Sequence, residues 1–511
     1  MKQATKINQI ILLVQSLSKA EKRYIRLYTN IQNGDKNYML IYDLVCQDLS
    51  AEQIYTKFCN EANEKSFEMA VKHLYQVILD CLVLLREKQD IQTTIFNHIT
   101  KANILFEREL YNNAFSELEK ARKLATIYEK DTLLLLIYRT ELKYLRTLHF
   151  DRINEKELIS KQVQINEIMN YTRNTNQHLQ LYDILKHRIT YKGSARSNKQ
   201  KENLNDLVLN ELNLIANHSY QGFEPRKLHL LFQATYYLNT GNYKSAIRFY
   251  KELIALFEAN QHLILNPPIY YLSAIEGVLD SLYVIGLYKE MPFFLSKLKE
   301  ISKGNYPTEF IIEVQARIFL YELSGLLNTG QFNTAKQYFE SHTDFLTKKS
   351  PIAGPDTQLK LHLYSTILYF SLGEYTKARK SLKKIFASGK LYHTLPSYRI
   401  ARLINLLIQA ELGNYDFFTN EINSIKRTIR YEKQIYITEK LLFRFLSAHP
   451  LPIYKRDREK LWIQYQKEVI RIREDKYEKR LLKIFDFTAW IESKLTNTPF
   501  RDILIQIQNQ I

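Results

Sequence analysis

Five fragments of the sequence share one pattern, and their spacing constrains the fold more than any other feature. In each, a glycine is followed two positions later by an aromatic residue, and a small or apolar residue comes three positions after the aromatic. Successive glycines are 45, 44, 43 and 40 residues apart. Recurrence at a nearly constant period predicts stacked structural units, each packed on its neighbours. The fragments are Gly241 with Tyr243 and Ala246, Gly286 with Tyr288 and Met291, Gly330 with Phe332 and Ala335, Gly373 with Tyr375 and Ala378, and Gly413 with Tyr415 and Phe418.

An earlier copy of the pattern lacks the glycine. Tyr111, with Ala114, Leu118 and Ala121 after it, lies 132 residues before Tyr243, which is three periods of about 44. The same register is therefore expected to continue through the middle of the chain.

Each unit is expected to be a pair of helices. Glycine and proline account for only 13 and 11 of the 511 residues, so the tight turns that strand-rich folds need are few. Ala378, Leu382 and Ile385 fall on one helical stripe, which predicts a buried face. The long period predicts two helices of roughly 18 to 20 residues in each unit, about 27 to 30 Å long. The alternative is an irregular helical bundle.

The fragment around Gly241 resembles the turn of a tetratricopeptide repeat. The resemblance rests on Ala234, Tyr237, Gly241, Tyr243, Ala246, Ile247 and Tyr250. It implies that glycine closes the first helix, that the aromatic residue begins the second, and that alanine permits close helix approach. The expected fold is an all-α, right-handed α-solenoid, with Thr235 and Asn239 among the residues of its groove. The family's period is 34 residues, so its rules for ligand positions are not carried over.

The ends of the chain lack the repeat. We expect an N-terminal helical cap at residues 1–90, the tetratricopeptide-like solenoid at 91–448 and a charged helical cap at 449–511. Capping boxes at Ser18–Glu21 and Ser50–Gln53 predict helix starts in the first part. An alternative is that this part reads DNA, with Ser66–Arg86 as a recognition or dimerisation helix. Its apolar positions favour burial instead; they are Phe67, Val71, Leu74, Leu82 and Leu85.

Three further segments resemble an uncharacterised family of bacterial cytosolic helical-repeat proteins. They are Ser16–Tyr24, Asn405–Asp416, and Phe485–Asp486–Phe487 through Trp490–Lys494 to Pro499–Phe500. This resemblance supports the helical-repeat fold. It implies no activity, ligand or functional residue.

The sequence contains none of the common motifs of catalysis or cofactor binding. It has no GxxxxGK[ST] or GxGxxG loop, no HExxH pair and no GxSxG elbow. The cysteines, Cys46, Cys59 and Cys81, match no zinc pattern and are expected to be buried free thiols. We therefore expect a non-enzyme without catalytic residues, metal or cofactor. The start of the chain does not read as a secretory signal, and no stretch is long enough to span a membrane, which predicts a cytoplasmic protein.

The formal net charge is +18, and two clusters contribute much of it. The first lies in a stretch, residues 375–410, without any acidic residue; it comprises Lys377, Arg379, Lys380, Lys383, Lys384, Lys390, Arg399 and Arg402. The second comprises Lys186, Arg188, Lys192, Arg196, Lys199 and Lys201. On a helix, the lysines of the first cluster lie opposite Ala378, Leu382 and Ile385, which is typical of a solvated outer face. The alternative is a surface that binds nucleic acid.

A stack of helical hairpins has a concave surface, so its shape predicts binding. The sequence predicts a scaffold or adaptor that holds a protein or peptide partner in this groove. One alternative is a nucleic-acid-associated factor that uses the basic clusters. Another is a regulator in which the N-terminal cap reads DNA while the repeats sense a peptide. The partner, the process and the oligomeric state do not follow from the sequence.

Overall fold

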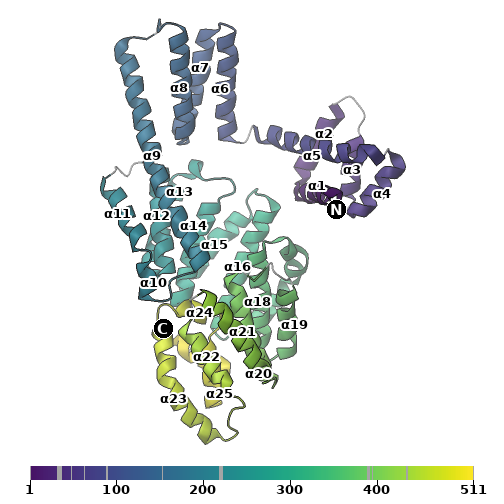
Figure 1. Ribbon diagram of the computed structural model, residues 1–511, viewed down its shortest axis with the longest axis vertical. Helices are drawn as coiled ribbons and strands as arrows, with labels where there is room; N and C mark the ends of the chain where they lie inside the picture. The colour runs from purple at the N-terminus through teal and green to yellow at the C-terminus, as the bar shows by residue number, and fades with distance from the viewer. Residues whose placement is uncertain are drawn as a thin grey trace. The chain divides into compact units, whose positions relative to one another are not determined.

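The protein is all-α, as predicted. The computed structural model describes residues 2–31, 37–47, 49–62, 64–87, 90–151, 153–217, 222–387, 392–393, 395–432 and 435–509. In these described ranges every regular element is a helix, and no residue lies in a β-strand (Figure 1). By their internal contacts the residues divide into two units, Met1–Arg173 and Asn174–Ile511, and the division falls within one long helix, α9.

The first unit begins with five helices around a core of their own. The predicted capping boxes are present: Ser18 N donates to Glu21 Oε2 at 2.7 Å, and Ser50 caps α4. The core includes Phe67, Val71 and Leu74 of α5, whereas Leu82 and Leu85, which were expected on the same buried face, are only partly buried. These helices are α1 (Lys2–Ser16), α2 (Lys19–Ile31), α3 (Asn37–Cys46), α4 (Ala51–Glu61) and α5 (Glu64–Glu87).

The rest of the first unit contains the copy of the pattern without glycine. Glu109 takes a positive φ of 60°, the conformation that glycine supplies elsewhere, and α7 begins at Tyr111. Ala114, Leu118 and Ala121 are buried against the preceding and following helices. The helices are α6 (Ile91–Glu107), α7 (Tyr111–Ile127), α8 (Asp131–Thr147) and α9 (Glu155–Lys192).

The second unit consists of successive helical hairpins followed by a C-terminal segment. Its first helices are α12 (Phe223–Asn239), α14 (Ile269–Ile285), α16 (Thr308–Asn328), α18 (Pro355–Ser371), α20 (Pro396–Glu411) and α22 (Ile437–Ser447). Its second helices are α13 (Tyr243–Ala259), α15 (Met291–Ser302), α17 (Phe332–Ser341), α19 (Tyr375–Ala387) and α21 (Phe417–Glu432). Two short helices, α10 (Asn198–Glu202) and α11 (Asn205–Asn217), precede them, and η1 to η4 are single turns at Gln261–Leu263, Tyr288–Glu290, Phe345–Lys349 and Ser350–Ile352.

Each of the five repeat glycines lies in the turn between the two helices of a hairpin. Their φ angles are 77°, 81°, 72°, 75° and 76° in chain order, a region that other residues rarely adopt. The second helix begins at the aromatic residue after Gly241, Gly330 and Gly373. After Gly286, however, Tyr288 lies in a 3₁₀ turn and the helix begins at Met291, and after Gly413 the helix begins at Phe417 instead of Tyr415.

Most helices of the hairpins are shorter than the period predicted, although α16 has 21 residues. α12 to α14 have 17 residues each, but α15 has 12 and α17 only 10. The remaining residues of the period lie in the connections between hairpins. Proline explains several of these boundaries, because it lacks an N–H and is tolerated at a helix start: Pro307 precedes α16, Pro355 begins α18 and Pro396 begins α20.

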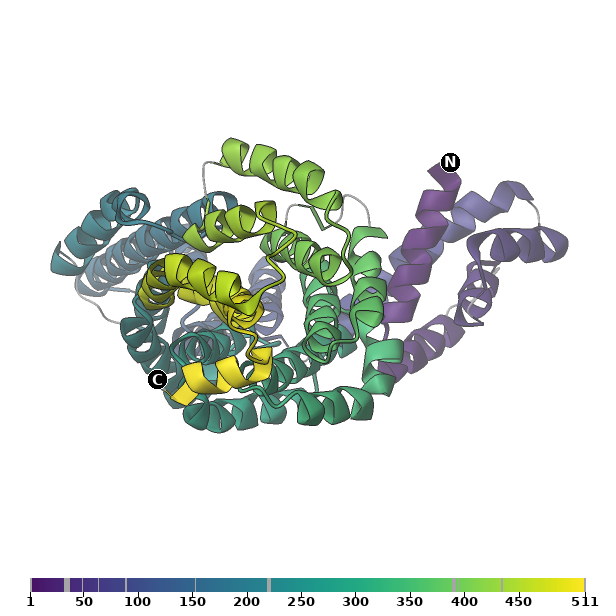
Figure 2. The ribbon, with the colours of Figure 1, turned by 90° about the horizontal axis from the view of Figure 1, so that it is seen from below.

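The C-terminal segment packs along the hairpins of the second unit. It comprises α23 (Lys455–Glu474), α24 (Lys479–Ile484), α25 (Phe487–Thr496) and α26 (Phe500–Asn509). Figure 2 shows the hairpins curving around these helices. Lys476 lies against the Gly241 turn, and Arg501 and Ile505 lie against the Gly330 turn. The segment expected as an end cap therefore also contacts hairpins near the middle of the chain, while the three-part division remains a prediction.

Candidate functional site

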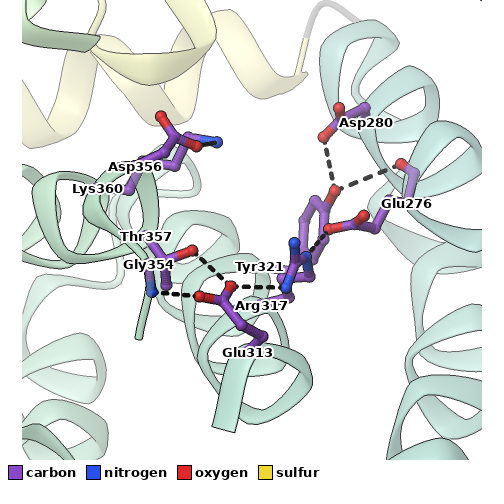
Figure 3. Close-up of polar contacts among 9 residues, drawn as sticks. All are labelled: Glu276, Asp280, Glu313, Arg317, Tyr321, Gly354, Asp356, Thr357 and Lys360. Atoms are coloured by element: carbon purple, nitrogen blue, oxygen red, sulfur yellow. Dashed lines mark hydrogen bonds and ion pairs between the residues drawn. The ribbon is translucent and has the colours of Figure 1, made fainter. Parts of the chain in front are cut away.

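A cluster of charged side chains crosses three successive first helices of the second unit, α14, α16 and α18 (Figure 3). It lies on the face that also meets the C-terminal segment, which we call the inner face. The cluster contains four carboxylates and two cations; they are Glu276, Asp280, Glu313, Asp356, Arg317 and Lys360.

Arg317 lies at the centre of the cluster. Its Nε atom pairs with the carboxylate of Glu276 on the neighbouring first helix, and its terminal nitrogen pairs with Glu313 Oε2 at 2.8 Å, one turn earlier on its own helix. A planar guanidinium can hold two carboxylates in this way because its N–H groups point in fixed directions. Arg317 thus links α14 to α16.

Glu313 extends the network to the start of α18. Its Oε1 atom accepts the Gly354 backbone N–H at 2.5 Å, and its Oε2 atom accepts the Thr357 hydroxyl at 2.7 Å. Gly354 is the N-cap of α18, so a carboxylate here also faces the positive end of that helix. The same side chain therefore fixes the hairpin spacing and caps a helix.

Tyr321 completes the network toward α14. Its hydroxyl donates to Asp280 Oδ1 at 2.6 Å and lies 3.4 Å from the Glu276 carbonyl oxygen. Burial, followed by the nearby carboxylates, raises the pKa of Tyr321 well above its ordinary value. The phenol therefore stays protonated and keeps its role as donor.

The cluster is recessed but reaches solvent. The side chains of Glu276, Glu313 and Arg317 are 27%, 22% and 28% exposed. Burial raises the pKa of Glu276, and Arg317 opposes that shift. Lys360 and Asp356, paired at 2.7 Å, lie further out at 44% and 46% exposure. With more carboxylates than cations, the cluster presents a negative, acceptor-rich surface.

The C-terminal halves of the same helices are covered by the C-terminal segment. Tyr283 of α14 and Asn328 of α16 both donate to the backbone carbonyl of Lys483, at 2.8 and 2.9 Å. Thr235 and Asn239 of α12, which the sequence suggested as groove residues, are buried. Asn239 accepts from Ser194 at 2.7 Å and lies 3.5 Å from the guanidinium of Arg480. Thr235 and Asn239 therefore make contacts within the chain and are not exposed in a groove.

Two carboxylates, Glu411 and Glu478, anchor the C-terminal segment further. Trp490 Nε1 donates to Glu411 at 2.7 Å, and Lys494 pairs with the same carboxylate at 2.6 Å. The carboxylate of Glu478 accepts the backbone N–H groups of Ile437 and Thr438, which are the first residues of α22. Glu478 thus caps a helix that begins 41 residues earlier in the chain.

The first basic cluster divides into two environments. Lys377, Arg379, Lys380, Lys383 and Lys384 are exposed on α19, opposite the buried Ala378, Leu382 and Ile385. Arg399 and Arg402 do not join them: Arg399 pairs with the buried Glu439, and Arg402 pairs with Glu421 at 2.7 Å. Each of these two arginines thus pairs with a carboxylate on a neighbouring helix. Lys390 lies outside the described residues.

The second basic cluster is dispersed. Arg196 stacks 4.0 Å over the ring of Tyr436, whereas Lys199 is exposed on α10. The Lys192 side chain lies outside the described residues. Arg188 pairs with Asp206 at 2.6 Å.

Sequence reasoning did not identify the polar cluster, although a signal was present. The sequence of α14, IYYLSAIEGVLDSLYVI, contains only two charged residues, Glu276 and Asp280, and they are four positions apart. That spacing places both on one helical face. A pair of carboxylates in an otherwise apolar helix needs buried partners, which only the fold reveals.

The comparisons with known proteins add no assignment: no family model matches the chain, and no curated protein matches it significantly. None of the described helices is long and apolar enough to cross a membrane. The described residues also contain no group of three or more His, Cys, Asp or Glu that would hold a metal ion. Cys81 is buried, which raises the pKa of its thiol to about 11, whereas Cys46 is exposed and Cys59 is only partly buried, contrary to expectation.

Proposed function

We propose that the chain is a non-enzymatic cytoplasmic adaptor that holds a protein or peptide partner. In this proposal the hairpins form a right-handed, tetratricopeptide-like α-solenoid, and the partner binds the part of the inner face that the C-terminal segment leaves uncovered. The observation that supports it is the charged cluster on α14, α16 and α18.

The energetics of the cluster favour a role in recognition over one in stability. Removing charged groups from water costs free energy, and well-packed apolar residues usually stabilise a fold as well as or better than a buried ion network does. A chain that keeps six charged groups across three hairpins therefore gains something besides packing. Their partial exposure lets a ligand reach them. Binding surfaces commonly keep charged groups despite the cost of removing them from water, because these groups contact the partner.

The excess of carboxylates indicates the chemistry of the partner segment. Each carboxylate oxygen can accept more than one hydrogen bond, so Glu276 and Asp280 keep acceptor capacity beyond their internal partners. Backbone N–H groups and Lys or Arg side chains supply such donors. We therefore propose that the bound segment is basic.

The test uses the full chain as bait in affinity purification. A specific partner should be retained by the wild type and by the control E300Q/E309Q, which alters exposed carboxylates outside the cluster. It should be lost from E276Q/D280N. The affinity of the retained protein is then measured by titration with the purified wild-type and variant chains. Equal affinity for the wild type and E276Q/D280N would refute the proposal.

One observation favours a second function, association with nucleic acid. Lys380, Lys383 and Lys384 form an exposed ridge on α19, and such ridges neutralise phosphates. In this case RNA or DNA binding falls steeply with added salt and is lost in K380E/K383E/K384E. Binding that is insensitive to salt and to these substitutions would rule it out.

A further inference from the structure

The second unit contains a cavity where three parts of the chain meet. Its volume is about 360 Å³, and its walls come from the Gly241 turn, from α10 and from the C-terminal segment. The cavity is separate from the charged cluster on α14, α16 and α18.

Four lysines line this cavity. Lys201 belongs to α10, Lys244 to the first turn of α13, and Lys476 and Lys479 to the C-terminal segment. No acidic residue is part of the lining, and none of the four lysines forms an ion pair with a carboxylate in the described ranges. Lys476 lies 4.8 Å from the ring of Tyr477, which is a contact that leaves its charge unneutralised. The fold therefore brings four positive charges together from distant positions in the sequence.

Two carboxylates that flank Lys476 and Lys479 in the sequence accept hydrogen bonds from groups outside the cavity lysines. Asp475 accepts the backbone N–H of Tyr477 at 2.7 Å, and Glu478 caps α22. Like charges held at one cavity repel one another, and this cost is offset when an anion enters. The first turn of α13 adds a smaller positive contribution from its backbone N–H groups, of which that of Ser245 donates to the Asn242 side chain.

We propose that this cavity binds a small organic molecule that carries a phosphate group. A phosphate oxygen accepts hydrogen bonds from several ammonium groups at once, and lysine is a common phosphate ligand. The organic part would contact Tyr237 and Ile285, which also line the cavity. A volume of about 360 Å³ lies at the small end of the range for ligand pockets, which fits a sugar phosphate or a mononucleotide and not a polymer.

The site is tested on the purified full chain by calorimetric titration with three probes: inorganic pyrophosphate, glucose 6-phosphate and adenosine monophosphate. The variant K244Q/K476Q/K479Q removes three charges while keeping chain length. The matched control, K289Q/K303Q/K467Q, removes three charges from exposed positions that lie outside both the cavity and the α19 ridge. At least one organic phosphate should bind more tightly than pyrophosphate. The cavity variant should weaken its binding at least about tenfold, and the control by less than about twofold.

Three outcomes would overturn the proposal. The first is an absence of binding by all three probes at millimolar concentration, checked as well by a lack of any shift in melting temperature. The second is an equal loss of binding in both variants, which would indicate non-specific charge attraction. The third is tight binding of single-stranded RNA without binding of the small phosphates. Circular dichroism of both variants verifies that they are folded, which is expected because none of the six substituted lysines is buried.

Discussion

The ring of Tyr250 on α13 fills the space where Gly277 on α14 lacks a side chain. A Cβ atom at Gly277 would lie 2.2 Å from Cζ of Tyr250, far inside van der Waals contact. Tyr250 is only 4% exposed and is held between neighbouring helices, so its ring has little room to move. The absence of one side chain therefore lets two consecutive hairpins approach closely.

Gly277→Ala should accordingly destabilise the protein. The added methyl group overpacks a filled site, which typically costs about 1 to 3 kcal/mol. Urea denaturation followed by circular dichroism measures the change. The matched control is Gly325→Ala on α16, where an added Cβ meets nothing within 4 Å. It should raise the free energy of unfolding by about 0.5 to 1 kcal/mol, because alanine favours the helix. Equal effects of the two substitutions would show that the contact with Tyr250 is unimportant.

Glu478→Ala should destabilise the second unit through the start of α22. The substitution leaves the part-buried N–H group of Ile437 and the buried N–H group of Thr438 without their acceptor, which costs about 1 to 3 kcal/mol. Glu478→Gln retains one carbonyl oxygen and should cost less. Glu474→Ala, at an exposed position on α23, should stay within about 0.5 kcal/mol of the wild type. If Glu474→Ala and Glu478→Ala were equally stable in urea, the cap that Glu478 provides for α22 would not contribute to the stability of the protein.

Local signals in the sequence predicted much of the fold. A left-handed turn residue between two helices favours glycine so strongly that Gly241, Gly330 and Gly373 identify hairpin turns without any knowledge of packing. The stripe of Ala378, Leu382 and Ile385 similarly identifies a buried face. Helix lengths were less predictable, because a period does not say how its residues divide between helix and connection.

The inner face could not be predicted in the same way. Nothing near Asn239 in the sequence indicates that Arg480, 241 residues later, will cover it. The lysines of the cavity illustrate the same limit, since Lys201 belongs to a cluster visible in the sequence but meets Lys244 and Lys476 only in the folded unit. Sites built from distant segments depend on tertiary packing, which periodicity does not encode.

Trp490→Ala should test how firmly the C-terminal segment is held. Trp490 is 2% exposed, and its truncation removes a large buried ring together with the hydrogen bond to Glu411. The expected loss is about 3 to 5 kcal/mol. The control is Trp462→Ala on α23, the other tryptophan of the chain, which is only half-buried and should cost less. A larger loss for Trp462→Ala would indicate that the segment is anchored elsewhere.

Lys483 should make the free energy of unfolding increase with pH above about 8, relative to a chain that lacks this amine. Burial lowers the pKa of this amine to about 8, with Asp486 opposing the shift. In the unfolded chain the amine keeps its ordinary pKa of about 10.4. Between these values the unfolded state binds more protons than the folded state, so the free energy of unfolding increases with pH across this window.

Lys483→Met should abolish that increase and be at least as stable as the wild type at pH 7, because it removes a charge whose burial is costly. The lysine also donates to Tyr288 Oη at 3.0 Å, so the substitution removes one hydrogen bond as well as the charge. Urea midpoints measured from pH 7 to 10 compare the two chains. Lys467→Met, at an exposed position on α23, removes the same charge and should retain the wild-type rise. A rise that persists in Lys483→Met would have to originate in another group, and the assignment to this buried amine would then be wrong.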